Sequence, residues 1–289
     1  MLARKELCMS HTSSSQRTTT TPIVLTIAGS DSGGGAGIQA DIKAISATGS
    51  YACSVITAIT AQNTQGVNGI LPIPLKMVEQ QLDAIFSDLN VQAVKIGMLA
   101  DSDIIQLVAA KIRHYQPPFL VIDPVMVATS GDVLLQQQAI TTLKTELLPL
   151  ADIITPNLPE AAALTGLDIP QSMADMQAMI SALRNINPHA VLLKGGHLEQ
   201  SRDSTDLLIL ATDVIELTTP RINTHNTHGT GCTLSAAIAS YLAQGNDLTT
   251  ATSLAKRYIT AAITAADELK IGHGHGPVNH FFAGHHHVR

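Results

Sequence analysis

The chain has 289 residues, of which 45% are hydrophobic and 14% are charged, and its formal net charge at pH 7 is -6. This composition supplies a large buried core and excludes a disordered protein. The basic residues are spread along the chain without an extended basic patch, so we do not expect a nucleic acid as partner.

The cysteines and the apolar runs favour a soluble cytoplasmic protein. Cys8, Cys53 and Cys232 are too scattered for a disulfide framework or a zinc site, which fits a reducing compartment. No run of about 18 apolar residues is present, and residues 1–21 lack the apolar core of a secretory signal, so no membrane partner is expected.

Both ends of the chain have unusual compositions. Residues 10–21 are almost all Ser and Thr, which predicts a disordered leader over residues 1–21. Residues 284–289 are rich in His and predict a flexible tail rather than a metal site, because three successive histidines do not readily face one ion.

Between these ends, short apolar runs alternate with stretches of helical period up to about residue 270. The alternation predicts one α/β domain over residues 22–283, with a mostly parallel central sheet flanked by helices. The expected strands are Ile23–Ala28, Ala52–Thr60, Ala93–Ile96, Phe119–Ile122, Ile153–Thr155, Val191–Lys194, Asp206–Leu210 and Val214–Leu217. The expected helices are Gly37–Thr48, Leu75–Leu89, Asp101–His114, Gln136–Leu147, Leu158–Leu164, Met173–Asn185, Gly231–Ala243 and Leu248–Leu269. Ligands of such sheets bind beyond the carboxyl ends of the strands, so the residues that follow strands are the first candidates for a site.

A glycine-rich turn, AGSDSGGGAG, follows the first strand at residues 28–37. Its backbone can approach a ligand closely. It is not a secure dinucleotide fingerprint, and it lacks the G-x-x-x-x-G-K-[ST] pattern of a P-loop. Taken alone, it fits a flexible turn as well as a binding site.

A second glycine turn, NTHGTGCT at residues 226–233, opens an apolar helix. Amides at a helix N-terminus favour an anion, such as a developing phosphoryl group. The alternative is a glycine cap that lets the helix pack tightly on the sheet. Cys232 favours the anion site, because a thiol in a first helical turn should have a lowered pKa, whereas a structural cysteine prefers an inert apolar pocket.

Together with these turns, nine segments occur in the order of a known family, the hydroxymethylpyrimidine/phosphomethylpyrimidine kinases of the ribokinase superfamily, which the chain resembles over residues 22–283. The segments are TIAGSDSGGGAGIQADIKA, CSVITAITAQNTQGV, VKIGML, VIDPVM, SGD, ITPNLPEAAALTG, VLLKGGH, NTHGTGCTLSAAIA and GPVNHF. The resemblance implies a three-layer ribokinase-like fold, a homodimer, and the use of Mg²⁺ and ATP. It implies phosphorylation of 4-amino-5-hydroxymethyl-2-methylpyrimidine to the monophosphate, and of the monophosphate to the diphosphate, in thiamine biosynthesis.

The resemblance also implies catalytic roles. Sugar kinases of the superfamily carry an aspartate as general base after the G-[AT]-G turn, and this chain has Cys232 there, as the pyrimidine-kinase branch does. As a hypothesis, the Cys232 thiolate takes the proton of the substrate hydroxyl while the amides of Gly229, Thr230 and Gly231 hold the moving phosphoryl group.

Four residues are implied to bind the substrate. Gln62 matches the glutamine that reads the pyrimidine, because its amide offers both a donor and an acceptor. Gly29, Asp41 and Met98 complete the pocket. The alternatives are a solvated loop for Gln62, stabilisation of a helix N-terminus by Asp41, and core filling by Met98.

The metal and nucleotide residues come from strand ends. Asp123 is expected to bind magnesium or a substrate phosphate, and Asn157 with Glu160 matches an N-x-x-E metal motif that is also a helix-capping arrangement. Lys194 is implied at the nucleotide phosphates, with a solvated lysine as the alternative. Asp206 and Thr227 are implied on the nucleotide side.

Three positions depart from the family pattern. Thr129, His225 and His273 stand where relatives commonly carry lysine, which predicts weaker nucleotide binding or greater pH sensitivity. A lid that shields ATP from water is expected, and residues 31–37 and 129–133 are its candidates.

Three other functions compete with this interpretation. A pyridoxal kinase of the same superfamily is the nearest, although Gln62 favours the pyrimidine. A regulatory protein that binds nucleotide without turnover is opposed by the presence of Cys232 and Asp123. A nicotinamide-dependent dehydrogenase rests on the first glycine turn alone and lacks an acidic residue at the end of the second strand.

Overall fold

The computed structural model describes residues 20–126, 137–187, 189–196, 198 and 202–284. The predicted leader up to residue 19, residues 285–289 of the predicted tail, and Thr129 with the candidate lid 129–133 lie outside the described residues. None of the described helices is both long and apolar enough to cross a bilayer.

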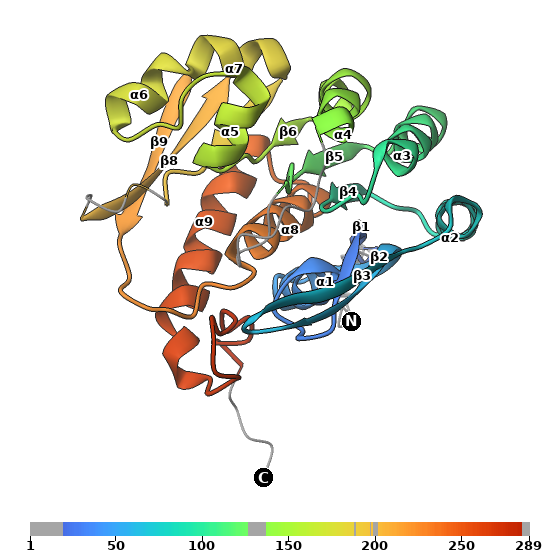
Figure 1. Ribbon diagram of the computed structural model, residues 1–289, viewed down its shortest axis with the longest axis horizontal. Coiled ribbons are helices and arrows are strands. Elements are labelled where there is room, and N and C mark those ends of the chain that lie inside the picture. Colours follow the sequence, from blue (N-terminus) through green and yellow to red (C-terminus); the bar gives the residue numbers. More distant parts are fainter. Residues whose placement is uncertain (1–19, 127–136, 188, 197, 199–201, 285–289) are drawn as a thin grey trace, which may run out of the picture.

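Nine strands of the described chain form one sheet in the order β3-β2-β1-β4-β5-β6-β7-β8-β9 (Figure 1). The strands are β1 Ile23–Asp31, β2 Tyr51–Asn63, β3 Gly66–Pro72, β4 Ala93–Ile96, β5 Phe119–Ile122, β6 Ile153–Ile154, β7 Ala190–Leu193, β8 Asp203–Leu210 and β9 Val214–Pro220. The strands from β2 to β7 in this order run parallel, whereas β3 pairs antiparallel with β2 at one edge and β8 and β9 continue antiparallel from β7 at the other. The predicted mostly parallel sheet is confirmed.

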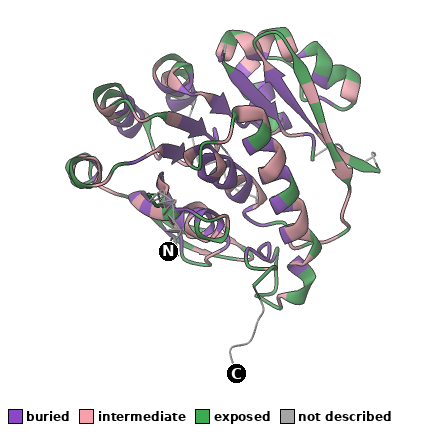
Figure 2. Ribbon diagram, turned by 180° about the vertical axis from the view of Figure 1, so that it is seen from behind, coloured by how far each residue is buried: buried purple, intermediate pink, exposed green. Residues whose placement is uncertain are grey.

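Helices cover both faces of the sheet and make three layers. The helices are α1 Gly37–Ala47, α2 Leu75–Asp88, α3 Ser102–Tyr115, α4 Gln137–Thr142, α5 Leu158–Thr165, α6 Met173–Ala178, α7 Ile180–Ile186, α8 Thr230–Ala243 and α9 Leu248–Thr264. One buried cluster joins the sheet to α1, α8 and α9, and another joins its opposite face to α2 through α7. Figure 2 shows the central strands and the helix sides that face them as buried, whereas the edge strands β3 and β9 are partly or fully exposed.

Apart from shifted ends, such as α9 ending at Thr264 rather than Leu269, the structure differs from the predicted elements in three places. β3 was missed because Gly66, Gly69 and Pro72 read as turn residues, and it forms only by pairing with β2 at the sheet edge. The expected helix Met173–Asn185 is divided at Met179 into α6 and α7. The expected helix Gln136–Leu147 ends as α4 at Thr142 and continues as a π-helical turn, Leu143–Leu147.

The topology sets the place of the site. The chain leaves β1 for β2 on one side and later returns to pair β4 on the other side of β1. The loops that follow β1 and β4 therefore diverge and leave a crevice at the carboxyl ends of the parallel strands.

Candidate active site

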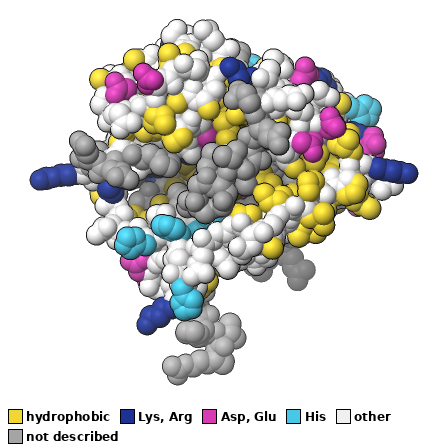
Figure 3. Space-filling model, in the orientation of Figure 1, with side chains coloured by type: hydrophobic (Ala, Val, Ile, Leu, Met, Phe, Trp, Pro, Cys, Tyr) yellow, Lys and Arg dark blue, Asp and Glu magenta, His cyan; other side chains and the backbone are white. Residues whose placement is uncertain are grey.

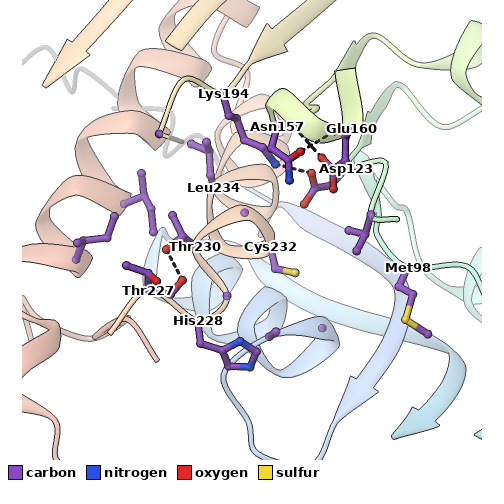
Figure 4. A pocket seen from close by; sticks show the side chains of 18 of the residues that line it. Met98, Asp123, Asn157, Glu160, Lys194, Thr227, His228, Thr230, Cys232 and Leu234 are labelled. Atoms are coloured by element: carbon purple, nitrogen blue, oxygen red, sulfur yellow. Dashed lines mark hydrogen bonds and ion pairs between the residues drawn. The ribbon is translucent and has the colours of Figure 1, made fainter. Parts of the chain in front are cut away.

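A cavity of about 910 Å³ opens at the carboxyl ends of the parallel strands. Its wall combines the ends of the strands with the N-terminus of α8, as Figure 4 shows for Asp123, Lys194 and Cys232. Every predicted site residue except Asp41 lies in this wall. They are Gly29, Gln62, Met98, Asp123, Asn157, Glu160, Lys194, Asp206, Thr227, Gly229, Thr230, Gly231 and Cys232.

The second glycine turn forms the N-terminus of α8. Gly229 caps the helix with φ 78°, a conformation that favours glycine. The amide of Thr230 already donates to the Thr227 carbonyl at 3.2 Å, and the Thr230 hydroxyl donates to the same oxygen at 2.7 Å. The first amides of a helix have no acceptor inside it, so Gly231 and Cys232 supply the amides best placed for an anion.

Cys232 lies in the first turn of α8, and its sulfur points into the cavity (Figure 4). Burial raises the pKa of the Cys232 thiol to about 11, while the positive charge of Lys95 and an amide hydrogen bond from Gly37 oppose the shift. The prediction of a lowered pKa was therefore wrong, because the cost of burying a thiolate exceeds the opposing effects of the Lys95 charge and the Gly37 amide.

Lys95 in β4 is a site residue that the sequence reasoning missed. Its fully buried ammonium contacts both carboxylate oxygens of Asp41, at 2.8 and 2.7 Å, and the Thr26 hydroxyl donates to the same carboxylate at 2.6 Å. Burial alone would lower the pKa of Lys95, but the charge and hydrogen bond of Asp41 together with the charges of Cys232 and Asp123 outweigh it, and the pKa is raised. An unpaired charge is too costly inside a buried strand, so the lysine in the otherwise apolar segment AVKI could have predicted a buried ion pair.

The prediction for Asp41 needs correction. Asp41 lies behind the cavity wall, with its carboxylate committed to Lys95 and Thr26, so it does not line the substrate pocket. Nor does it stabilise the N-terminus of α1, which has no acidic residue in its first turn. Lys95 is the group that lines the cavity, and Asp41 holds it there.

A second lysine and carboxylate face the glycine turn of α8. Lys194 Nζ lies 2.8 Å from Asp123 Oδ1, which also accepts from the Thr155 hydroxyl at 3.0 Å. A Cβ atom at Gly231 would lie 3.2 Å from Lys194 Nζ and 3.4 Å from Asp123 Oδ2. Burial would lower the pKa of Lys194, but the charges of Asp123 and Glu160 raise it, so the ammonium stays charged beside the turn.

Asn157 and Glu160 form a complete capping box at the start of α5. The Glu160 amide donates to Asn157 Oδ1, and the Asn157 amide donates to Glu160 Oε2, both at 2.8 Å. Burial raises the pKa of Glu160 to about 7, against the attraction of Lys194. The capping interpretation is confirmed, and the metal role stays a prediction.

The cavity wall also holds a third ion pair. Asp206 accepts from Lys256 Nζ at 2.7 Å and from the Gly195 amide at 2.9 Å. Four apolar side chains of the wall that were not predicted from the sequence are Pro220, Ile222, Ile259 and Ile263. They come from β9, the segment after it and α9, so no single motif contains them. His225 and His273 are exposed and lie outside the cavity wall.

Comparison with known proteins identifies the family. The family model described as Phosphomethylpyrimidine kinase matches residues 31–279. The chain belongs to this family of kinases. A phosphomethylpyrimidine kinase structure from Clostridium difficile 630 is 45% identical with a TM-score of 0.74, and the match covers 83% of this chain and 99% of that one.

Two further relatives bear on the activity. The hydroxymethylpyrimidine/phosphomethylpyrimidine kinase of Rhizobium meliloti is 54% identical over 90% of this chain and 97% of its own length. An ADP complex of Bacillus subtilis pyridoxal kinase is 35% identical with a TM-score of 0.85, covering 91% of this chain and 99% of that one. The three-layer kinase fold is thus shared by phosphomethylpyrimidine and pyridoxal kinases.

Proposed function

We propose that this member of the phosphomethylpyrimidine kinase family transfers phosphate from ATP to the hydroxymethyl group of 4-amino-5-hydroxymethyl-2-methylpyrimidine, and then to the monophosphate, in thiamine biosynthesis. The observation that carries the proposal is one continuous cavity wall. This wall brings together the Gln62 amide, which can hydrogen-bond a pyrimidine, the Cys232 thiol, and the glycine turn at the N-terminus of α8. A substrate hydroxyl near the Cys232 thiol would then face the terminal phosphate of ATP, held at the glycine turn of α8.

The chemistry follows from these positions. The substrate hydroxyl attacks the terminal phosphorus of ATP, its proton passes to the Cys232 sulfur, which must first lose its own proton, and the bond to ADP breaks. Lys95 favours the thiolate, because its charge is the strongest one that lowers the thiol pKa. The amides of Gly231 and Cys232 and the ammonium of Lys194 would stabilise the charge on the moving phosphoryl group.

Magnesium would enter with the nucleotide. Among the described residues, no group of three or more His, Cys, Asp and Glu side chains is arranged to hold a metal ion. Mg²⁺ keeps several waters and commonly takes one or two carboxylates together with phosphate oxygens, so the residues present fit an ion bound chiefly by ATP. Asp123 and Glu160 would hold it, and it would neutralise phosphate charge.

The test is ATP consumption by the purified chain with Mg²⁺ and the hydroxymethylpyrimidine, with products weighed by mass spectrometry. Successive appearance of the mono- and diphosphate is the expected result. Cys232→Ala should lose nearly all turnover while keeping its melting temperature. Near-normal turnover by this variant would contradict the role of the thiol as base.

A pyridoxal kinase is the second candidate, because the Bacillus subtilis pyridoxal kinase has the same fold with a TM-score of 0.85. The same assay with pyridoxal separates the two functions. Phosphorylation of pyridoxal without phosphorylation of the pyrimidine would replace the first proposal.

We further propose a homodimer in a reducing cytoplasm. Exposed apolar side chains gather over β2, β3 and α2 (Figure 3), including Leu71 at 65% and Met77 at 50% exposure. An apolar edge strand exposed to water invites pairing with another chain, and a second copy would cover it. Sedimentation should give twice the chain mass, and Leu71→Arg should give the monomer. The free thiols of Cys53 and Cys232 fit a reducing compartment.

A further inference from the structure

A hydrogen bond joins the two glycine turns. Asp31, the last residue of β1, has Oδ2 2.9 Å from Nε2 of His228, which directly precedes Gly229. Burial would raise the pKa of Asp31, but the hydrogen bonds from His228 and from amides of the first turn outweigh it, and the pKa is lowered. The Asp31 carboxylate is therefore ionised and can only accept, so His228 Nε2 carries the proton that it donates.

The same carboxylate organises the first turn, at residues 28–37. It accepts the amides of Gly33 at 2.8 Å, Gly35 at 3.0 Å and Ala36 at 2.8 Å. The Asp31 side chain therefore collects donors from both glycine turns. Moving one turn away from the other would leave some of these buried polar groups without a partner, which is costly.

The backbones of the two turns also pack closely where this hydrogen bond forms. A Cβ atom at Gly35 would lie 2.4 Å from His228 Cδ2, and one at Gly229 would lie 1.8 Å from the Gly35 carbonyl oxygen. The His228 amide donates to the Gly276 carbonyl at 3.0 Å. The first turn, which the sequence suggested as a lid, is thus tied to the start of α8.

The segment that this contact holds carries the groups proposed for phosphoryl transfer. Gly229 caps α8, and the amides of Gly231 and Cys232 follow in its first turn. The Cys232 sulfur accepts a hydrogen bond from the amide of Gly37, at the end of the first glycine turn. Gly37 has little freedom to move, since its φ is 55° and a Cβ atom there would lie 2.3 Å from the Gly29 carbonyl oxygen. The fit between the two turns therefore sets where the α8 amides and the sulfur lie.

We propose that Asp31 and His228 are positioning residues for the phosphoryl transfer, whose hydrogen bond holds the first turn of α8 and the Cys232 sulfur where the transfer requires them. The inference rests on the proposed function, in which this turn stabilises the moving phosphoryl group and the sulfur takes the hydroxyl proton. The role needs no contact of Asp31 or His228 with the substrate. Because a misplacement of about 1 Å can cost about a hundredfold in rate, a small shift of the turn should slow the transfer more than it weakens binding.

Two substitutions of His228 test this role. His228→Gln can place an amide N–H near the position of Nε2 and keep the bond to Asp31, whereas the shorter His228→Asn cannot reach it. With Mg²⁺ and saturating ATP, kcat for the hydroxymethylpyrimidine should stay within about threefold of the original in His228→Gln and fall by about tenfold or more in His228→Asn. KM for both substrates should change by less than about threefold in either variant. Rescue by Gln assigns the effect to the hydrogen bond and not to the imidazole ring.

Further variants separate positioning from stability. Tyr258→Phe is the matched control, because it removes another buried hydrogen bond, from the Tyr258 hydroxyl to the His280 carbonyl at 2.8 Å, and this side chain does not line the cavity. It should keep kcat within about twofold of the original. In an Asp31→Ala background, His228→Asn should have no further effect on kcat, because its partner is gone. Unchanged kcat in His228→Asn, equal losses in His228→Gln and His228→Asn, or a loss confined to KM would overturn the inference.

A measurement on the unsubstituted protein needs neither substrate nor turnover. Long-range ¹H–¹⁵N correlation at about pH 8.5, where an ordinary imidazole is neutral, should show His228 as the Nε2–H tautomer, with its signals assigned by their loss in His228→Gln. The Nδ1–H tautomer would refute the bond to Asp31 whatever the enzyme phosphorylates. Failure of the unsubstituted protein to phosphorylate the pyrimidine would instead refute the proposed function, and pyridoxal would then replace the pyrimidine in the comparison of kcat.

Discussion

Replacing Lys95 by Met should destabilise the protein strongly and for a reason that a second substitution can expose. Lys95 and Asp41 have fully buried side chains, and the ammonium contacts both carboxylate oxygens at 2.8 and 2.7 Å. Lys95→Met leaves the Asp41 charge buried with only the Thr26 hydroxyl as a described side-chain donor. Removing one partner of a buried pair costs about 3–5 kcal/mol, a large part of a typical stability of about 5–15 kcal/mol.

The double variant Lys95→Met/Asp41→Asn removes the stranded charge and keeps an oxygen for Thr26. It should recover more than half of the loss and unfold within about 2 kcal/mol of the original protein in urea titrations. The partly exposed pair of Lys111 and Asp83 gives the matched control, since Lys111→Met should cost far less than Lys95→Met.

Activity of the folded double variant separates stability from chemistry. Cys232 loses the cation that acts most strongly on its thiol, so kcat/KM should fall by about tenfold or more even though the fold is kept. A double variant as unstable as the single one would refute the argument from charge burial. A double variant with full activity would refute the influence of Lys95 on the thiol.

Three other perturbations follow from the geometry. Alkylation of Cys232 by iodoacetamide, followed by peptide mass mapping, should accelerate through about pH 9 without a plateau, because its pKa is raised to about 11; a plateau below about pH 8 would contradict this. Gly35→Ala should lower kcat/KM about a hundredfold or more, since its Cβ would lie 2.4 Å from His228 Cδ2, whereas Gly69→Ala, with nothing nearer than 3.9 Å, should change it little. Glu160→Gln should flatten the pH dependence of stability without Mg²⁺. Its folded-state pKa is raised from 4.5 to about 7, so the folded state holds a proton that the unfolded state releases, and stability falls as pH rises through this window. The loss that Glu160 causes is about 3 kcal/mol, and equal slopes for both proteins in urea titrations at pH 5 and 8 would contradict the shift.

The sheet and most helices were predictable because their patterns are local. The apolar run Phe119–Ile122 forms a strand at the predicted position, and so does Ala93–Ile96, which is apolar except for Lys95. β3 was not predictable in this way, because its glycines and proline disfavour a strand and only the pairing with β2 forms it. The break between α6 and α7 at Met179 was not predictable either, because neither helix contains a glycine or proline.

The site was predictable where a motif contains the residue, and the missed features depend on contacts between distant segments. The resemblance brought together Cys232, Asp123 and Lys194, which share the cavity wall. The raised pKa of Cys232 depends on burial, which motif spacing does not report. The contact of His228 with Asp31 joins residues 197 positions apart, so neither residue marks the other in the sequence.

The charges in the cavity wall bear on the three positions, Thr129, His225 and His273, where the sequence departs from the lysines of the family pattern. Among the described residues, three lysines line the wall, and each is paired with a carboxylate: Lys95 with Asp41, Lys194 with Asp123, and Lys256 with Asp206. Arg221 also lines the wall, and its guanidinium donates to the carbonyls of Gly196 and Leu198. A buried ammonium and carboxylate largely cancel each other's field, so these three ion pairs act as dipoles and not as three free cations. A magnesium nucleotide brings an anion for an ammonium and a cation for a carboxylate together, whereas a free polyphosphate brings only the anion. Under the proposed function, we therefore expect the cavity to bind the magnesium complex of ATP in preference to free ATP. His225 and His273 do not line the cavity wall.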